Sequence, residues 1–100
     1  MIEQIKQHYR IAPFVAPHTN GLKSSGHGFF IGNCPFCKKE RVFWVADHLG
    51  LCGCFNPGCD AHSDQRQDPH SKPLDVINFH ARIKGITNEE AAADLEADIP

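Results

Sequence analysis

Apolar and polar residues follow a helical period at the start of the chain. Isoleucines and a tyrosine recur there three and four residues apart, which predicts a short amphipathic helix over residues 2–10. Pro13 and Pro17 then break the pattern. The polar run behind them is rich in turn-forming residues, so the sequence predicts a loop over residues 18–28.

The middle of the chain alternates with a period of two, which is typical of strands. A short apolar run predicts a strand over residues 29–32, and the clearest alternation predicts a second strand over residues 41–47. Residues 48–50 suit a hairpin turn, and residues 51–55 are expected to return as the partner strand. We therefore expect a short antiparallel sheet.

The last third of the chain begins with residues 60–72, which are almost wholly polar and predict a surface loop. A helix is expected over residues 74–84, with Pro73 suited to its first turn and Gly85 to its C-terminal stop. The residues expected on its apolar stripe are Val76, Ile77, His80, Ala81 and Ile83.

A second helix is predicted over residues 88–97. Thr87 and Glu90 have the spacing of a capping box, in which each side chain bonds the backbone N–H of the other residue. The residues expected to pack this helix are Ala91, Ala92 and Leu95. The elements together predict a small α+β fold with one N-terminal and two C-terminal helices.

Cysteines are the most informative residues of the sequence. Cys34 and Cys37 are two residues apart, Cys54 and Cys59 are four apart, and Cys52 precedes the second pair. Two close pairs on either side of a short β-like segment are typical of a zinc ribbon, in which two turns supply a tetrahedral set of four thiolates. The spacing therefore predicts one structural Zn²⁺ held by Cys34, Cys37, Cys54 and Cys59.

Other uses of the cysteines fit less well. Disulfides need an oxidising compartment, while the chain starts with a polar run in place of a secretory signal and has an odd number of cysteines. A redox C-x-x-C motif would be expected in a βαβ setting, which the predicted order of elements does not provide. Four thiolate ligands also disfavour catalytic zinc, which keeps a position open for water.

Length and charge set further limits. One hundred residues make one small domain with a limited core, for which a metal ion adds needed stability. Residues 1–50 carry six Lys and Arg against three acids, and residues 51–100 carry four against nine. This asymmetry allows a nucleic-acid surface on the basic half. No apolar run could span a membrane, and reduced thiols without a targeting segment predict a cytoplasmic protein.

Several motifs along the chain resemble the zinc-binding domain of bacterial-type (DnaG-like) DNA primases. The matching stretches are Gly21-Leu22-Lys23-Ser24-Ser25-Gly26, Phe29-Phe30-Ile31-Gly32-Asn33-Cys34-Pro35-Phe36-Cys37, Phe43-Trp44-Val45, Cys54-Phe55 ahead of Cys59, Asp75-Val76-Ile77-Asn78-Phe79 and Glu90-Ala91. The resemblance covers nearly all 100 residues. It implies a single domain over residues 1–100, with the zinc ribbon at about 29–60.

The chain also departs from this family. Cys37 stands where the family usually has histidine, as in phage-type primases with four cysteines. The loop at residues 38–42 lacks the usual Lys-Thr-Pro-Ser, the second cysteine pair is wider, and an insertion of roughly ten residues precedes Asp75. The alignment with the family's Cys-Phe favours Cys54 over Cys52 as a ligand. Two histidines, His48 and His62, are weaker alternatives as ligands.

The resemblance implies a function as well. The family's zinc domain grips single-stranded template DNA and helps to select the site of RNA primer synthesis in DNA replication. Polymerisation belongs to a separate Toprim-type domain, in cis or in trans, and a replicative helicase is a further possible partner. This sequence has no carboxylate cluster at strand ends and no glycine-rich phosphate loop, so no catalytic residue is predicted here.

For DNA binding, the sequence predicts that Lys23, Lys38, Lys39 and Arg41 contact phosphates and that an aromatic residue stacks on a base. Strand alternation places Phe43 and Trp44 on opposite faces, so one of them belongs to the core. Trp44 is the predicted DNA contact, while core packing is expected for Phe29 and Phe30. The alternative from another class is a zinc-ribbon module that docks on a replication or transcription complex through its acidic helices.

Overall fold

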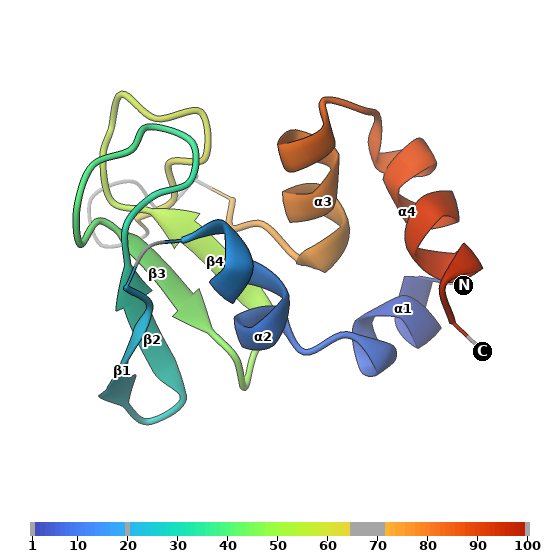
Figure 1. Cartoon of the computed structure of the whole chain (residues 1–100), viewed down its shortest axis with the longest axis horizontal. Helices are drawn as coiled ribbons and strands as arrows, with labels where there is room; N and C mark the ends of the chain where they lie inside the picture. The colour runs from blue at the N-terminus through green and yellow to red at the C-terminus, as the bar shows by residue number, and fades with distance from the viewer. Residues whose placement is uncertain (1, 20, 65–71, 100) are drawn as a thin grey trace.

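The computed structural model describes residues 2–19, 21–64 and 72–99 (Figure 1). Its elements in chain order are α1 (Ile2–His8), α2 (Ile11–Val15), the 3-10 helix η1 (Ala16–His18), β1 (Lys23–Gly26), β2 (Phe29–Gly32), β3 (Phe43–Ala46), β4 (Leu51–Cys54), α3 (Val76–Lys84) and α4 (Asn88–Ala97). The strands form one antiparallel sheet in the order β1-β2-β3-β4. The predicted α+β class is confirmed.

The sheet and the helices α3 and α4 occupy opposite sides of the molecule, and α2 lies between them (Figure 1). The core forms where these elements meet. Its largest fully buried side chains include Phe43 of the sheet, Phe79 of α3, and Ile5, Ile11 and Val15 of the N-terminal helices. Rings from separate elements meet there, because Phe79 lies 6.1 Å from Phe43 and 5.6 Å from Phe36 between ring centroids.

The register of the sheet decides which side chains share a face. Because Phe43 pairs with Cys54 and Val45 with Cys52, these residues point to the core face, where all four are fully buried. Trp44 pairs with Ile31 and with Gly53, so it points to the other side of the sheet. We call that side the outer face.

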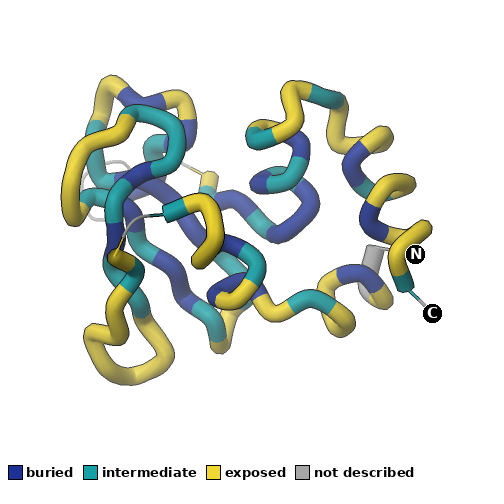
Figure 2. The backbone as a smooth tube through the Cα atoms, viewed as in Figure 1, coloured by how far each residue is buried: buried dark blue, intermediate teal, exposed yellow. Residues whose placement is uncertain are grey.

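The N-terminal third differs from the prediction in two ways. Pro13 lies inside α2, because it occupies the first turn, where a backbone N–H has no partner within the helix. The predicted loop over residues 18–28 contains the strand β1, whose four residues are all exposed and so lack an apolar alternation. The turn that joins β1 to β2 uses left-handed backbone at His27 and Gly28. Figure 2 shows this hairpin as mainly exposed.

The segment before α3 also corrects the prediction. Residues 61–64 are not a surface loop, because the N–H of Ser63 donates to the carbonyl of Cys54, and both Ser63 and Asp64 are buried. The helix α3 begins at Val76 because Asp75 caps it, which places Pro73 ahead of the helix and not in its first turn. Residues 65–71, also part of the predicted loop, lie outside the described residues.

The two C-terminal helices have nearly the predicted spans, but the packing of α3 differs from the prediction. Phe79 is fully buried although the expected stripe omits it, and His80 lies at the edge of α3 with its Nε2 atom 2.6 Å from Asp94 of α4. The capping box of Thr87 and Glu90 forms as predicted. Within residues 2–19, 21–64 and 72–99, no helix has the length and apolar character that a membrane span requires.

Candidate metal centre and outer sheet face

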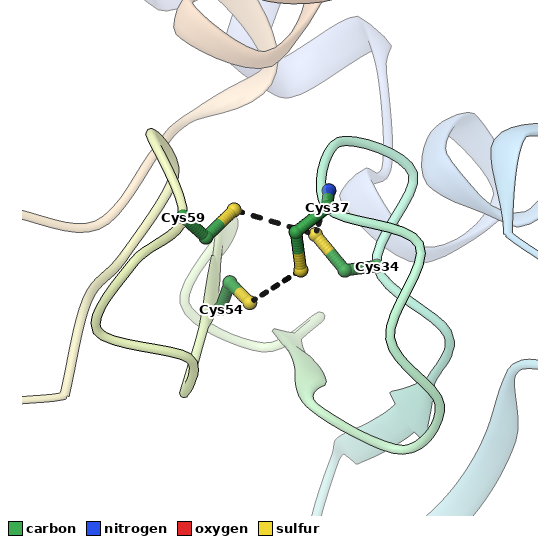
Figure 3. Close-up of side chains that lie close together, drawn as sticks. All are labelled: Cys34, Cys37, Cys54 and Cys59. Carbon is green, nitrogen blue, oxygen red and sulfur yellow. Dashed lines mark hydrogen bonds between the residues drawn. The ribbon is translucent and has the colours of Figure 1, made fainter.

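Two tight turns bring four cysteines together. The first turn follows β2 and carries Cys34 and Cys37, while the second begins at Cys54, the last residue of β4, and carries Cys59. In the first turn, the N–H of Lys38 donates to the carbonyl of Cys34, and left-handed backbone at Lys38 turns the chain back toward β3. In the second, the N–H of Cys59 donates to the carbonyl of Asn56. Figure 3 shows the four thiols converging from the two turns.

The sulfur atoms have the spacing of a tetrahedral zinc site. All four lie within 4.8 Å of one another. The Sγ–Sγ distance is 3.6 Å between Cys34 and Cys59 and 3.8 Å between Cys37 and Cys54. A tetrahedral Zn²⁺ with Zn–S bonds of about 2.3 Å requires sulfur atoms about 3.8 Å apart. The cluster can therefore hold one zinc ion, and four thiolates would leave no ligand position for water.

Backbone N–H groups donate to the cysteine sulfur atoms. Cys34 Sγ accepts from the N–H groups of Phe36 and Cys37, Cys54 Sγ accepts from Asn56, and Cys59 Sγ accepts from Ala61, all at 3.4 Å. Such bonds favour the charged thiolate that a metal requires. The turns thus favour the thiolate form of the ligands even without a bound ion.

The thiols differ in their affinity for protons. Burial alone would raise the pKa of Cys37, but hydrogen bonds with the Asn56 side chain, the Lys39 backbone and neighbouring thiols lower it to about 6. Burial raises the pKa of Cys59 to about 11 and also raises the pKa of Cys54. Binding of a metal ion must therefore displace protons from the second pair.

The other candidate ligands lie outside this cluster. Cys52 is fully buried, and its backbone exchanges hydrogen bonds of 2.8 and 2.7 Å with that of Leu74. His62 directs Nδ1 at the carbonyl oxygen of Cys54, 3.2 Å away. His48 is exposed and packs edge-on against Phe29, with ring centroids 5.0 Å apart. These three residues therefore have structural surroundings of their own.

Trp44 and Lys23, two of the predicted DNA contacts, share the outer face. The register aligns Lys23, Ile31, Trp44 and Gly53 in one row across the four strands. The indole is fixed in place, since its Nε1 donates to the carbonyl of Ser63 at 2.8 Å. Phe43, the alternative stacking residue, is fully buried in the core.

A groove of about 500 Å³ runs over this face. The residues that line it are Ser25, Phe29, Ile31, Trp44, Ala46, Leu49, Leu51, Phe55, Ser63, Asp64 and Pro73. Most of these side chains are apolar, and Leu49 and Phe29 are substantially exposed. The prediction that Phe29 belongs to the core is wrong, because the register pairs it with Ala46 and turns it to the outer face.

The other predicted DNA contacts lie in the loop between Cys37 and β3. Lys38, Lys39 and Arg41 are all exposed. Arg41 adopts left-handed backbone, and its N–H donates to the side chain of Asn33 at 3.3 Å. Lys38 lines a separate cavity of about 440 Å³ next to Cys34, so it lies away from the groove. The structure thus groups Lys23 with Trp44 but does not gather all the basic residues at one point.

Known proteins share this fold although their sequences are distant. No family model and no curated protein matches the chain. A solved structure, that of the Aquifex aeolicus primase with its zinc-binding and RNA polymerase domains, matches with a TM-score of 0.68 and 22% identity. The match covers 94% of this chain and 20% of that one, so the chain spans about a fifth of its length. The resemblance predicted from the motifs is confirmed as a likeness of fold: this chain is folded like part of a bacterial primase.

Proposed function

We propose that this chain is the zinc-ribbon module of a DNA primase system and grips single-stranded template DNA near the site of primer synthesis. The observation that carries the proposal is the row on the outer face, in which Lys23 of β1 and Trp44 of β3 lie on either side of Ile31. A fixed aromatic ring and a cation on the same face suit an unpaired strand, which offers bases to stack and phosphates to neutralise. The likeness to a primase structure supports this choice.

In this proposal, the four cysteines hold one Zn²⁺ with a structural role. The ion supplies a fixed point that ties the turn after β2 to the turn after β4. The register of β3 and β4, and with it the position of Trp44 over Gly53, then depends on that point. Zinc affects DNA binding through the shape of the sheet and does not contact the DNA.

The basic residues attract the DNA backbone. Residues 21–46 contain four Lys and Arg and one acid, which gives this part of the chain a net charge of +3. We expect Lys23, Lys38, Lys39 and Arg41 to neutralise phosphates. Polymerisation is assigned to a Toprim-type domain in cis or in trans, and a replicative helicase is a further proposed partner.

The competing role is a docking module for another protein. Its basis is the acidic, exposed surface of α4, where Glu89, Glu90, Glu96 and Asp98 are all exposed. A basic partner could bind there. The two roles use different surfaces, so charge variants distinguish them.

A pair of matched double variants tests the proposal. Replacing Lys39 and Arg41 by alanine is expected to weaken binding of a fluorescent single-stranded oligonucleotide by roughly tenfold at low salt. The control replaces Arg82 and Lys84, two exposed cations on α3 that lie in a different part of the fold. The same number of charges is lost in each variant. Equal weakening in both would show general charge attraction and would contradict a specific DNA surface.

A further inference from the structure

Three aromatic residues of the outer face lie on one diagonal of the sheet. Trp44 of β3 is opposite Gly53, and Phe55 lies two residues beyond Gly53, where its N–H donates to the carbonyl of Val42 at 2.7 Å. On the other side, Phe29 of β2 is opposite Ala46, two residues beyond Trp44. The line Phe55, Trp44, Phe29 therefore runs in equal steps from the residue after β4, across β3, to β2. All three side chains line the same groove.

We infer that these three rings form a track for successive unpaired bases, so that Phe29 and Phe55 are binding residues in addition to Trp44. The inference rests on the proposed function and extends it to the spacing of the bases in the bound strand. Diagonal neighbours in an antiparallel pair are roughly 7–8 Å apart. Bases in a duplex strand are spaced by about 3.4 Å. Bases that follow the track must therefore be separated from one another, which a flexible single strand permits and a duplex does not.

The charge of Lys23 indicates how the strand would lie. Lys23 projects from β1, the edge strand on one side. Ser63 lies on the opposite side, next to β4, where its N–H donates to the carbonyl of Cys54. The ammonium group of Lys23 attracts phosphate, so the backbone is placed on the Lys23 side. The bases then point across the rings toward β4.

The two ends of the track differ in their surroundings. Phe55 follows the ligand Cys54 directly and so lies at the zinc end of the sheet. Phe29 lies at the hairpin end, where its ring packs against His48 at 5.0 Å and Leu49 is 60% exposed. A strand bound along the track would therefore run from the metal centre to the tip of the β3–β4 hairpin.

The test uses Trp44 as its own probe, because it is the only tryptophan of the chain. Stacking of a base should quench its fluorescence, and titration of the zinc-loaded protein with oligothymidylate then gives a dissociation constant. Phe29→Leu keeps apolar bulk but removes the ring, and is expected to weaken binding by about fivefold or more. Phe29→Tyr keeps the ring and is expected to bind as the wild type does. Phe55→Leu is expected to act like Phe29→Leu.

The control is Phe14→Leu, which removes a partly buried ring of α2 that does not line the groove. It is expected to leave the affinity nearly unchanged, and near-UV circular dichroism verifies that each variant is folded. If Phe29→Leu and Phe55→Leu bind like the wild type while Trp44 is still quenched, the track is wrong and the proposed function stands. If the folded wild type neither binds nor is quenched, both are wrong.

Discussion

Trp44 and Gly53 are paired across β3 and β4, and the indole occupies the space that a side chain at position 53 would need. A Cβ atom on Gly53 would lie 3.0 Å from Cζ2 of Trp44 and 2.7 Å from Cβ of Ser63. Glycine at this position thus lets the ring lie across β4, while the bond from its Nε1 to the Ser63 carbonyl holds it there. The stacking surface depends on a residue that has no side chain.

Gly53→Ala is therefore expected to destabilise the protein by about 1–3 kcal/mol, because the crowded atoms belong to packed groups. Urea unfolding followed by circular dichroism measures the change. The matched control is Gly58→Ala, where an added Cβ would meet nothing closer than Asn56 Oδ1 at 3.9 Å. Equal stability of the two variants would contradict the packing described for Trp44.

The metal centre predicts a contrast between two cysteines. Cys37→Ser is expected to lose tight zinc binding and much of the folded structure, since structural zinc contributes folding free energy directly. Cys52→Ala is expected to retain one zinc per chain, because its thiol lies outside the cluster. Zinc content by elemental analysis and melting temperature are the measurements. Full zinc content in Cys37→Ser, or loss of zinc in Cys52→Ala, would overturn the ligand assignment.

The ion pair of Asp47 with Arg10 predicts a defined pH dependence. Burial alone would raise the pKa of Asp47, but hydrogen bonds from the Arg10 guanidinium and the Ala12 N–H outweigh it and lower the pKa. The pKa of an unfolded aspartate is about 3.9. The stabilisation is therefore complete above that value and is lost only as the pH falls through the lower, folded pKa.

Asp47→Asn is accordingly expected to cost about 1–3 kcal/mol, and the cost should not shrink as the pH falls from 8 to 5, since His48 also lowers the pKa of Asp47. Urea unfolding of the zinc-loaded wild type and variant across this range measures it. A cost that shrinks between pH 6 and pH 5 would mean that the pKa of Asp47 is raised, and would contradict the geometry at Arg10 and Ala12.

The capping box of α4 lies away from the outer face and gives a prediction about stability alone. Thr87 Oγ1 accepts from the N–H of Glu90 at 3.1 Å, and the Glu90 carboxylate accepts from the N–H of Thr87 at 3.2 Å. Thr87→Ala is expected to reduce stability by about 1 kcal/mol and to leave DNA affinity unchanged. Thermal unfolding and oligonucleotide titration provide the two values. A matching loss of DNA affinity in the folded variant would favour a binding role for the acidic helices.

Elements with strong local signals are the ones that the sequence predicts well. The cysteine spacing locates both turns, the alternation around Trp44 locates β3, and the Thr87 capping box locates α4. In each case the chemistry that fixes the element lies within a few neighbouring residues, so the pattern can be read without knowledge of the fold.

Elements that depend on distant partners could not be read in this way. The strand β1 has no apolar face, and only its pairing with β2 makes it a strand. Ser63 is buried because it hydrogen-bonds to Cys54, which no local pattern indicates. The position of Phe29 follows from the register of β2 with β3. Two consecutive phenylalanines do not by themselves indicate which ring faces the core.

The central claim is that the zinc-loaded domain grips single-stranded DNA through cations and stacked rings. The most direct test is the dissociation constant for a short single-stranded oligonucleotide, measured by fluorescence anisotropy over a series of salt concentrations. If Lys23, Lys38, Lys39 and Arg41 neutralise four phosphates, the logarithm of the association constant should fall with the logarithm of salt concentration with a slope of about −3. Absence of binding at low salt by the folded, zinc-loaded protein, or binding with a slope near zero, would contradict the claim.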